Sequence, residues 1–170
     1  RVVQQANTVW NEALGKIDIE TSDYDSRTVF YTSLYHAFIQ PSLASDVDGR
    51  YRTMNHEIEQ DTSYTNYTVF SLWDTFRAAH PLYTIVAPEQ NQAFIRSLLR
   101  KYDESGILPK WEQASNETGT KIGYHAVSVI ADAMMKKQCD FDVKKALEAC
   151  IRSSVYDTTG ITPMMDREIR

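Results

Sequence analysis

The segment W-E-Q-A-S-N-E-T-G-T-K-I-G-Y-H, residues 111–125, separates two strong helical patterns and is itself a poor helix former. It combines small residues and glycines with a central carboxylate, Glu117, and it has Trp111 at its start and a Tyr-His pair at its end. Ligand-binding loops on helical scaffolds often have this composition, because small residues leave the backbone free and aromatic rings offer flat apolar surfaces. The segment therefore predicts either a binding loop or an ordinary connection between two helices.

Apolar residues recur with helical spacing on both sides of this segment. The pattern predicts helices over residues 2–18, 26–40, 67–80, 88–104, 123–137 and 141–155. Prolines and glycines mark their limits, because proline breaks a helix interior but favours its first turn. The expected markers are Pro41 and Pro81 at two ends, Pro88 at a start, and Gly106 and Thr159-Gly160 at two further ends. The chain is therefore expected to be all-α.

Residues 42–66 lack a helical period and contain Asp48-Gly49, a dipeptide typical of hairpin turns. They predict a long loop with a small β-hairpin excursion, and long loops in compact domains are usually functional or disordered. The D-V-D-G run is similar to the start of a calcium-binding loop, but Asn55 stands where that loop needs Glu, so a turn is favoured. This loop and the loop over 106–122 are expected to lie at the same end of the domain.

The segment over 67–80 is apolar on more than half of its helical circumference, which predicts a helix buried on more than one side. Trp73 is expected either to fill the core or to line a cavity as a stacking surface. Asp74 is expected to be a surface or capping charge, or to contact a ligand. The sequence leaves both choices open.

The composition is that of a globular domain, with 42% hydrophobic residues and a mean hydropathy of -0.44. The net charge of -5 argues against a nucleic-acid partner, because phosphate binding needs a basic face. No apolar run approaches the roughly 20 residues that span a bilayer. No signal peptide is recognisable, and the chain begins with Arg1 rather than Met, so we expect it to be part of a longer product.

Two cysteines, Cys139 and Cys150, fit no zinc-binding or redox spacing. Their expected role is that of small buried apolar side chains. Pairing in a disulfide is left open, because two cysteines of a secreted protein can pair.

A set of motifs follows one order along the chain: Y-T-S-L-Y-H (31–36), S-D-V-D-G-R-Y-R (45–52), Y-T-V-F-S-L-W-D-T-F-R-A-A-H-P (67–81), L-P-K-W (108–111), S-N-E-T (115–118) and G-Y-H-A-V (123–127). Together they resemble the catalytic domain of glycoside hydrolase family 92, a family of calcium-dependent exo-acting α-mannosidases. Such enzymes have an N-terminal β-sandwich followed by an (α/α)6 barrel. The resemblance implies that residues 1–170 form about half of that barrel, without the sandwich and the remainder of the barrel.

The resemblance also implies a reaction, the release of mannose from α-mannosides of the α-1,2-linked, N-glycan type with inversion. Inversion uses one carboxyl group as general acid and a second as base on the opposite face of the sugar. The family's acid is the glutamate of S-N-E-T, so Glu117 is the expected acid, and the base aspartate is expected outside this chain. The expected substrate-binding residues are Trp73, Asp74, Trp111, Asn116 and His125.

Further expectations follow from the same resemblance. Calcium is the implied cofactor, with ligands that the resemblance does not place on this chain; Asp46, Asp48 and Asp74 are candidates only for structural or substrate contacts. Mannose-containing glycans are the implied partners, and the implied location is secreted, periplasmic or at the cell surface. The chain alone is expected to be inactive and to self-associate through uncovered apolar helix faces. Composition by itself supports an alternative, a non-catalytic helical binding or scaffold module.

Overall fold

The computed structural model describes residues 1–155, and the chain divides into two compact units. Unit 1 is Arg1–Gln40 and unit 2 is Pro41–Arg170. The helix end predicted at Thr159-Gly160 lies outside the described residues.

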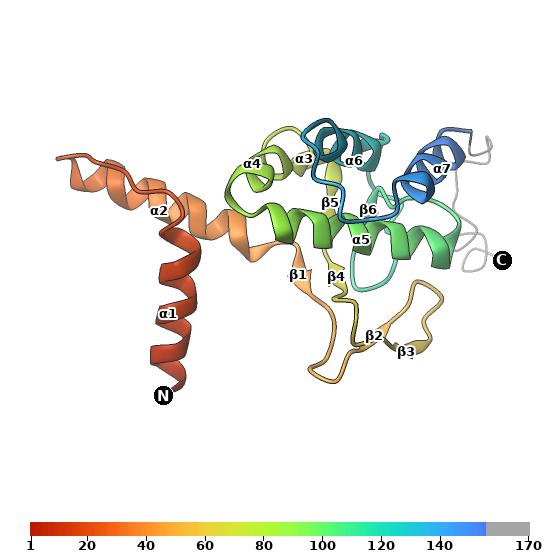
Figure 1. Cartoon of the computed structure of the whole chain (residues 1–170), viewed down its shortest axis with the longest axis horizontal. Coiled ribbons are helices and arrows are strands. Elements are labelled where there is room, and N and C mark those ends of the chain that lie inside the picture. Colours follow the sequence, from red (N-terminus) through yellow and green to blue (C-terminus); the bar gives the residue numbers. More distant parts are fainter. Residues whose placement is uncertain (156–170) are drawn as a thin grey trace. The chain divides into compact units, whose positions relative to one another are not determined.

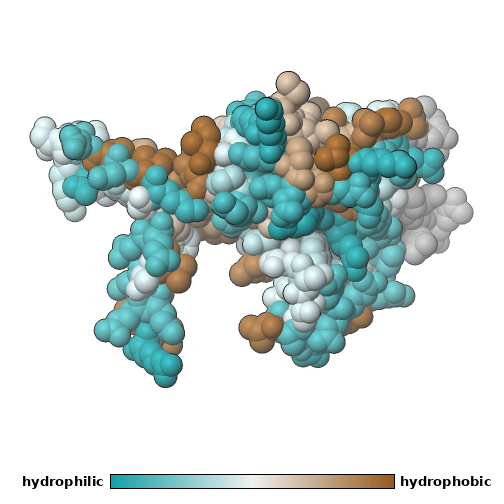
Figure 2. All heavy atoms as spheres, viewed as in Figure 1, coloured by the Kyte–Doolittle hydropathy of each residue, from teal (hydrophilic) through white to brown (hydrophobic). Residues whose placement is uncertain are grey.

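Unit 1 is a pair of helices, α1 (Val2–Leu14) and α2 (Tyr24–Ile39), drawn in red and orange in Figure 1. The two helices meet where the rings of Trp10 and Tyr35 lie 4.5 Å apart between centroids. Asp23 caps α2 by accepting the backbone N–H of Asp25, and Pro41 follows the helix end as predicted. Residues coloured as hydrophobic are visible along α2 in Figure 2, in keeping with the exposure of Val29 and Ile39.

The larger helices of unit 2 are α4 (Ala79–Val86), α5 (Pro88–Ser105), α6 (His125–Met135) and α7 (Val143–Ser154). Helix α5 is central, because it contacts α4, α6 and α7 (Figure 1). Pro88 occupies its first turn as predicted. Gly106 ends it with φ of 84°, a left-handed conformation that glycine adopts without strain.

The core of unit 2 lies between these helices. Helix α5 contributes large apolar residues to this core, while α6 and α7 contribute several alanines. The principal members are Phe94, Ile95, Leu98, Ala126, Val129, Ile130, Ala133, Ala146 and Ala149. Phe94 is the centre of an aromatic group and contacts the rings of Tyr67, Phe70, His80 and Tyr83.

Short antiparallel strand pairs hold the loops of unit 2 together. They are β1 (Ser42–Leu43) with β4 (Tyr67–Thr68), β2 (Arg50–Arg52) with β3 (Ile58–Gln60), and β5 (Phe70–Ser71) with β6 (Trp111–Glu112). The β2–β3 pair confirms the small hairpin predicted in 42–66. Asp48-Gly49 forms a turn just before β2, and the hairpin itself turns between Thr53 and Glu57.

The prediction of one helix over 67–80 is wrong. Residues 67–71 contain β4 and β5, separated by Val69 with φ of 65°, and only then does the short helix α3 (Leu72–Thr75) begin. Helix α4 continues through Pro81, its third residue, where a backbone N–H has no partner within the helix, so the proline does not break it. Short apolar runs fit a buried strand as well as a helix, which explains the error.

The two cysteines differ in environment, and neither forms a disulfide. Cys139 is exposed, so the prediction of a buried apolar role is wrong for it. Cys150 is half-buried against the core, and burial raises the pKa of its thiol.

Candidate functional site

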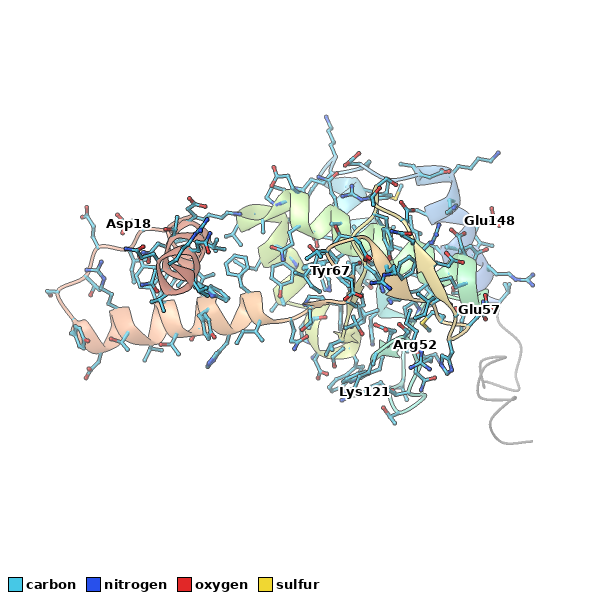
Figure 3. The ribbon with its side chains drawn as sticks, turned by 90° about the horizontal axis from the view of Figure 1, so that it is seen from below. Asp18, Arg52, Glu57, Tyr67, Lys121 and Glu148 are labelled. Carbon is cyan, nitrogen blue, oxygen red and sulfur yellow. The ribbon has the colours of Figure 1, made fainter. Side chains whose placement is uncertain are left out.

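The two predicted loops lie together in unit 2. They are connected by the hydroxyl of Ser115, which donates to the carbonyl oxygen of Arg52 over 2.6 Å. Just after the first loop, Ser71 of β5 lies opposite Trp111 of β6 in an antiparallel ladder. Arg52 from the 42–66 loop and Lys121 from the 106–122 loop are labelled on the same side of the ribbon in Figure 3. The expectation that these loops share one end of the domain agrees with these contacts.

Residues 111–118 form a tight hairpin. Glu112 and Glu117 pair across it, and the backbones of Gln113 and Asn116 exchange hydrogen bonds of 2.9 and 3.1 Å. The central residues, Ala114 and Ser115, have φ of 51° and 64°. Two consecutive positive φ angles are typical of a type I′ turn, which normally contains Asn-Gly. The sequence predicts a loop here but not the hairpin, because Ala-Ser is not a turn signal of this kind.

Glu117 is 5% exposed, and backbone donors hold its carboxylate. The N–H groups of Lys110, Trp111 and Gly119 lie 2.7, 3.2 and 3.0 Å from its oxygens. Such an arrangement fixes the orientation of the side chain, which a catalytic group requires. The same bonds close the base of the hairpin, so Glu117 also has a structural role in this loop.

Trp73 and Asp74 lie beside the hairpin on α3. The indole of Trp73 is 36% exposed, and the charged groups of Arg77 and Lys121 each lie 4.9 Å from its ring centroid. Asp74 accepts a hydrogen bond from the hydroxyl of Ser71 and lies 3.7 Å from the Lys121 ammonium. Because Ser71 pairs with Trp111, these side chains are next to the hairpin rather than elsewhere on the domain.

His125 begins α6 and stacks on Phe76, with ring centroids 4.3 Å apart and planes 10° from parallel. Gly123 leaves the space that this ring occupies. A Cβ at Gly123, where φ is 100°, would lie 2.2 Å from Nε2 of His125. The motif G-Y-H therefore contains a glycine that determines where its histidine lies.

We expect Gly123→Ala to displace the His125 ring from Phe76 while the core stays folded. The added methyl group meets a movable ring rather than backbone, and the positive φ itself costs about 1–2 kcal/mol for a non-glycine residue. The measurement is the NMR shift of the His125 ring protons, which the stacked Phe76 ring perturbs, together with the denaturant midpoint. Gly106→Ala is the matched control, because φ there is 84° and a Cβ would meet nothing within 4 Å. The control should lose a similar amount of stability and leave the His125 shifts unchanged. Unchanged His125 shifts in Gly123→Ala would contradict the role of Gly123 in placing this ring.

The remaining predicted substrate-binding residues are Trp111 and Asn116. Both are half-buried, and their backbone groups form hydrogen bonds within the hairpin. Trp111 lies in β6 and its carbonyl oxygen accepts the N–H of Thr118, while Asn116 closes the turn opposite Gln113. The structure thus brings Glu117 and the five predicted binding residues into one region, formed by the hairpin, α3 and the start of α6.

A buried ion pair beneath the hairpin was not predicted. Lys101 Nζ lies 3.3 Å from Glu112 Oε1, and both side chains are at most 2% exposed. Burial raises the pKa of Glu112, although Lys101 and hydrogen bonds from Ser115 and Thr68 oppose the shift. A signal existed: Lys101 is three residues after Leu98, on the buried face of α5, where an unpaired lysine is almost never found.

Two of the candidate carboxylates, Asp48 and Asp74, are engaged by other groups of the protein. Within residues 1–155, no group of three or more His, Cys, Asp or Glu side chains is placed to hold a metal ion. Asp48 pairs with Arg50 over 2.7 Å, and Asp74 is engaged by Ser71 and Lys121. In the same part of the chain, no helix is long and apolar enough to cross a membrane.

These features define a helical domain with a candidate site. In that site a hydrogen-bonded hairpin carries the Glu117 carboxylate, and the exposed Trp73 lies beside the hairpin. The chain belongs to glycoside hydrolase family 92: the model of the family's catalytic domain matches residues 1–167. This match confirms the family resemblance seen in the sequence motifs.

Solved structures of the family agree with this assignment. The chain is 41% identical to the GH92 α-mannosidase BT3965 from Bacteroides thetaiotaomicron, with a TM-score of 0.87 over 91% of this chain and 21% of that chain. The same α-mannosidase in complex with mannoimidazole gives 42% identity and a TM-score of 0.85, over 91% of this chain and 21% of that chain. The inverting mannosidase BT2199 from the same organism gives 34% identity and a TM-score of 0.79, over 87% and 20%. The chain thus spans about a fifth of the length of these structures. No curated protein matches the chain.

Proposed function

We propose that the complete protein containing this chain releases mannose from α-mannosides with inversion, and that Glu117 is the general acid. The observation that carries the proposal is the Glu117 carboxylate, buried and oriented on the hairpin by backbone N–H groups. Family membership supports the reaction class. Further support comes from two relatives, one solved with mannoimidazole and one described as an inverting mannosidase.

In the proposed mechanism, Glu117 donates its proton to the glycosidic oxygen as the bond to the leaving sugar breaks. The carboxylate formed by that step is stabilised by the N–H groups of Lys110, Trp111 and Gly119, which already point at it. A base on the opposite face activates water, and inverting enzymes place their two carboxyl groups roughly 6.5–9.5 Å apart. We propose that the base is an aspartate from outside this chain.

The proposed sugar contacts use the exposed edge of the site. Trp73 offers an indole face for the apolar side of a mannose ring, and the flexible side chains of Arg77 and Lys121 move aside when a sugar stacks there. Asp74 and His125 supply polar groups for the hydroxyls, with Trp111 and Asn116 at the hairpin side. The linkage proposed from the family resemblance is α-1,2, in glycans of the N-linked type.

We also propose that these helices are part of an (α/α)6 barrel that follows a β-sandwich, in a secreted, periplasmic or cell-surface enzyme. Exposed apolar side chains on and after α7, including Leu147, Ile151 and Val155, would be covered in the longer protein. In the isolated chain they favour self-association. Calcium remains part of the proposal through the family resemblance alone, and no step above depends on it.

The test is hydrolysis of an α-1,2-mannobioside by the complete protein, followed by NMR. The first mannose formed is expected to be the β anomer, because inversion of an α bond gives β product. A chelator is expected to reduce the rate, and residues 1–170 alone are expected to release no mannose. Initial α-mannose would refute inversion, and glycan binding without hydrolysis would favour the alternative, a helical binding module.

A further inference from the structure

The hairpin that carries Glu117 has a backbone that its own sequence does not favour. Ala114 and Ser115 both have positive φ, which is unfavourable for residues other than glycine, and neighbouring groups must hold such a conformation. The turn therefore depends on contacts outside it, and the position of Glu117 depends on the turn.

The Ser115 hydroxyl is held by the carbonyl oxygen of Arg52, while the backbone N–H groups of both strained residues lead to one carboxylate. The N–H of Ser115 donates to Glu112 Oε1 over 2.7 Å. The N–H of Ala114 donates to Thr68 Oγ1 over 2.7 Å, and the Thr68 hydroxyl in turn donates to Glu112 over 3.0 Å. Glu112 thus holds the N–H groups of both strained residues, one directly and the other through Thr68.

Glu112 is itself anchored to the core. Its 3.3 Å pairing with Lys101 connects the hairpin to α5, the central helix of unit 2. Lys101 Nζ also lies 3.3 Å from the side-chain oxygen of the buried Asn66. A buried ion pair contributes little net stability on average, but loss of one partner leaves an uncompensated charge in the interior. Such a pair is suited to defining one geometry.

We propose that Glu112, held by Lys101, is a positioning residue for Glu117: it sets the hairpin geometry that keeps the Glu117 carboxylate on its backbone donors. The link is short, because Glu112 pairs with Glu117 across the hairpin and follows Trp111, whose N–H is one of those donors. Because Glu112 is 0% exposed, we place it behind the site, where it acts through Glu117. This inference rests on the proposed acid role and adds the residues that make it possible.

The test uses the complete enzyme and the variant Glu112→Gln, which keeps the shape but removes the charge. Displacement of a catalytic group by about 1 Å can cost about 100-fold in rate. We therefore expect kcat to fall by about 10- to 100-fold on an α-mannobioside, whose leaving group needs the acid, and much less on a mannoside with an acidic phenol. Thr68→Val should show the same pattern more weakly, and it replaces Glu112→Gln if that variant does not fold.

Two comparisons separate positioning from general stability. Glu104→Gln is the matched control, because Glu104, on α5, is also a poorly exposed carboxylate, and it accepts a backbone N–H from Met54 rather than from the hairpin. It should affect the two substrates equally. The double variant Glu112→Gln/Glu117→Gln should be no slower than Glu117→Gln alone, because both changes act on one step. Equal losses on both substrates, or multiplying losses in the double variant, would overturn the proposal.

A readout without activity distinguishes failure of this inference from failure of the proposed function. Amide hydrogen exchange at Trp111 and Gly119, the donors to Glu117, should be faster in Glu112→Gln than in Glu104→Gln. If the parent enzyme releases no mannose, the proposed function fails while exchange still reports on the positioning. Unchanged exchange at both amides would overturn the positioning role whatever the activity.

Discussion

Glu117→Gln in the complete enzyme is expected to lower kcat on an α-mannobioside by about two to four orders of magnitude, the usual contribution of general acid catalysis. Glutamine keeps the shape of the side chain, and its amide oxygen can still accept the N–H groups of Lys110 and Trp111. The transferable proton is lost, and so is one acceptor oxygen, which the Gly119 N–H uses in the parent protein over 3.0 Å. A comparison of two leaving groups separates the chemical effect from this structural one.

The choice of leaving group makes this result diagnostic. A mannoside with an acidic phenol needs little protonation, so its hydrolysis should fall much less than that of the mannobioside. Glu57→Gln is a suitable control, because Glu57 is an exposed carboxylate in the 42–66 loop. It should leave both rates unchanged. Equal losses on the two substrates in Glu117→Gln would remove Glu117 from the acid role, and near-normal rates on both would remove it from the site.

Phe94→Ala is expected to reduce the free energy of unfolding by about 3–5 kcal/mol, the usual cost of emptying a buried aromatic position. Phe94 is 1% exposed, and the rings of Tyr67, Phe70, His80 and Tyr83 surround it at centroid distances of 4.8, 6.2, 6.1 and 5.5 Å. These rings come from β4, β5 and α4 and cannot all close on the space that alanine leaves. Since domains are stable by only about 5–15 kcal/mol, this loss is a large share of the total.

The measurement is denaturant unfolding of the 170-residue chain and its variant, followed by circular dichroism. Ile85→Ala is the matched control, because Ile85 is an apolar residue of the neighbouring helix α4 that is 76% exposed. It should change stability by less than about 0.5 kcal/mol. A loss of under about 1 kcal/mol in Phe94→Ala would show that the aromatic group is not the centre of the core.

Helix limits were predicted well at several positions where a local rule sets them, although the same kind of rule failed at Pro81, which lies within α4. Pro88 can begin a helix because its missing N–H would be unpaired there, and Gly106 can end one because it accepts a left-handed φ. Gln40 ends α2 just before Pro41 for a similar reason. Such effects depend on a residue and its immediate neighbours, so they are present in the sequence itself.

Local rules failed where the neighbours are distant along the chain. Residues 67–71 are apolar enough for a helix, but pairing with Ser42–Leu43 and with Trp111–Glu112 makes them strands. The 111–118 turn lacks the residues that favour its conformation, and Thr68, Arg52 and Glu112 hold it instead. Neither outcome could be read from a window of a few residues.

By itself, the sequence determined the helical class, the family motifs and the set of candidate site residues, because these depend on residue type and spacing. Only the tertiary structure decided the site's geometry: the donors on Glu117, the space that Gly123 leaves for His125, and the burial of Lys101 against Glu112. These are contacts between side chains and backbone atoms from different elements. Their energies depend on distance and on exclusion of water, and both arise only when the chain has folded.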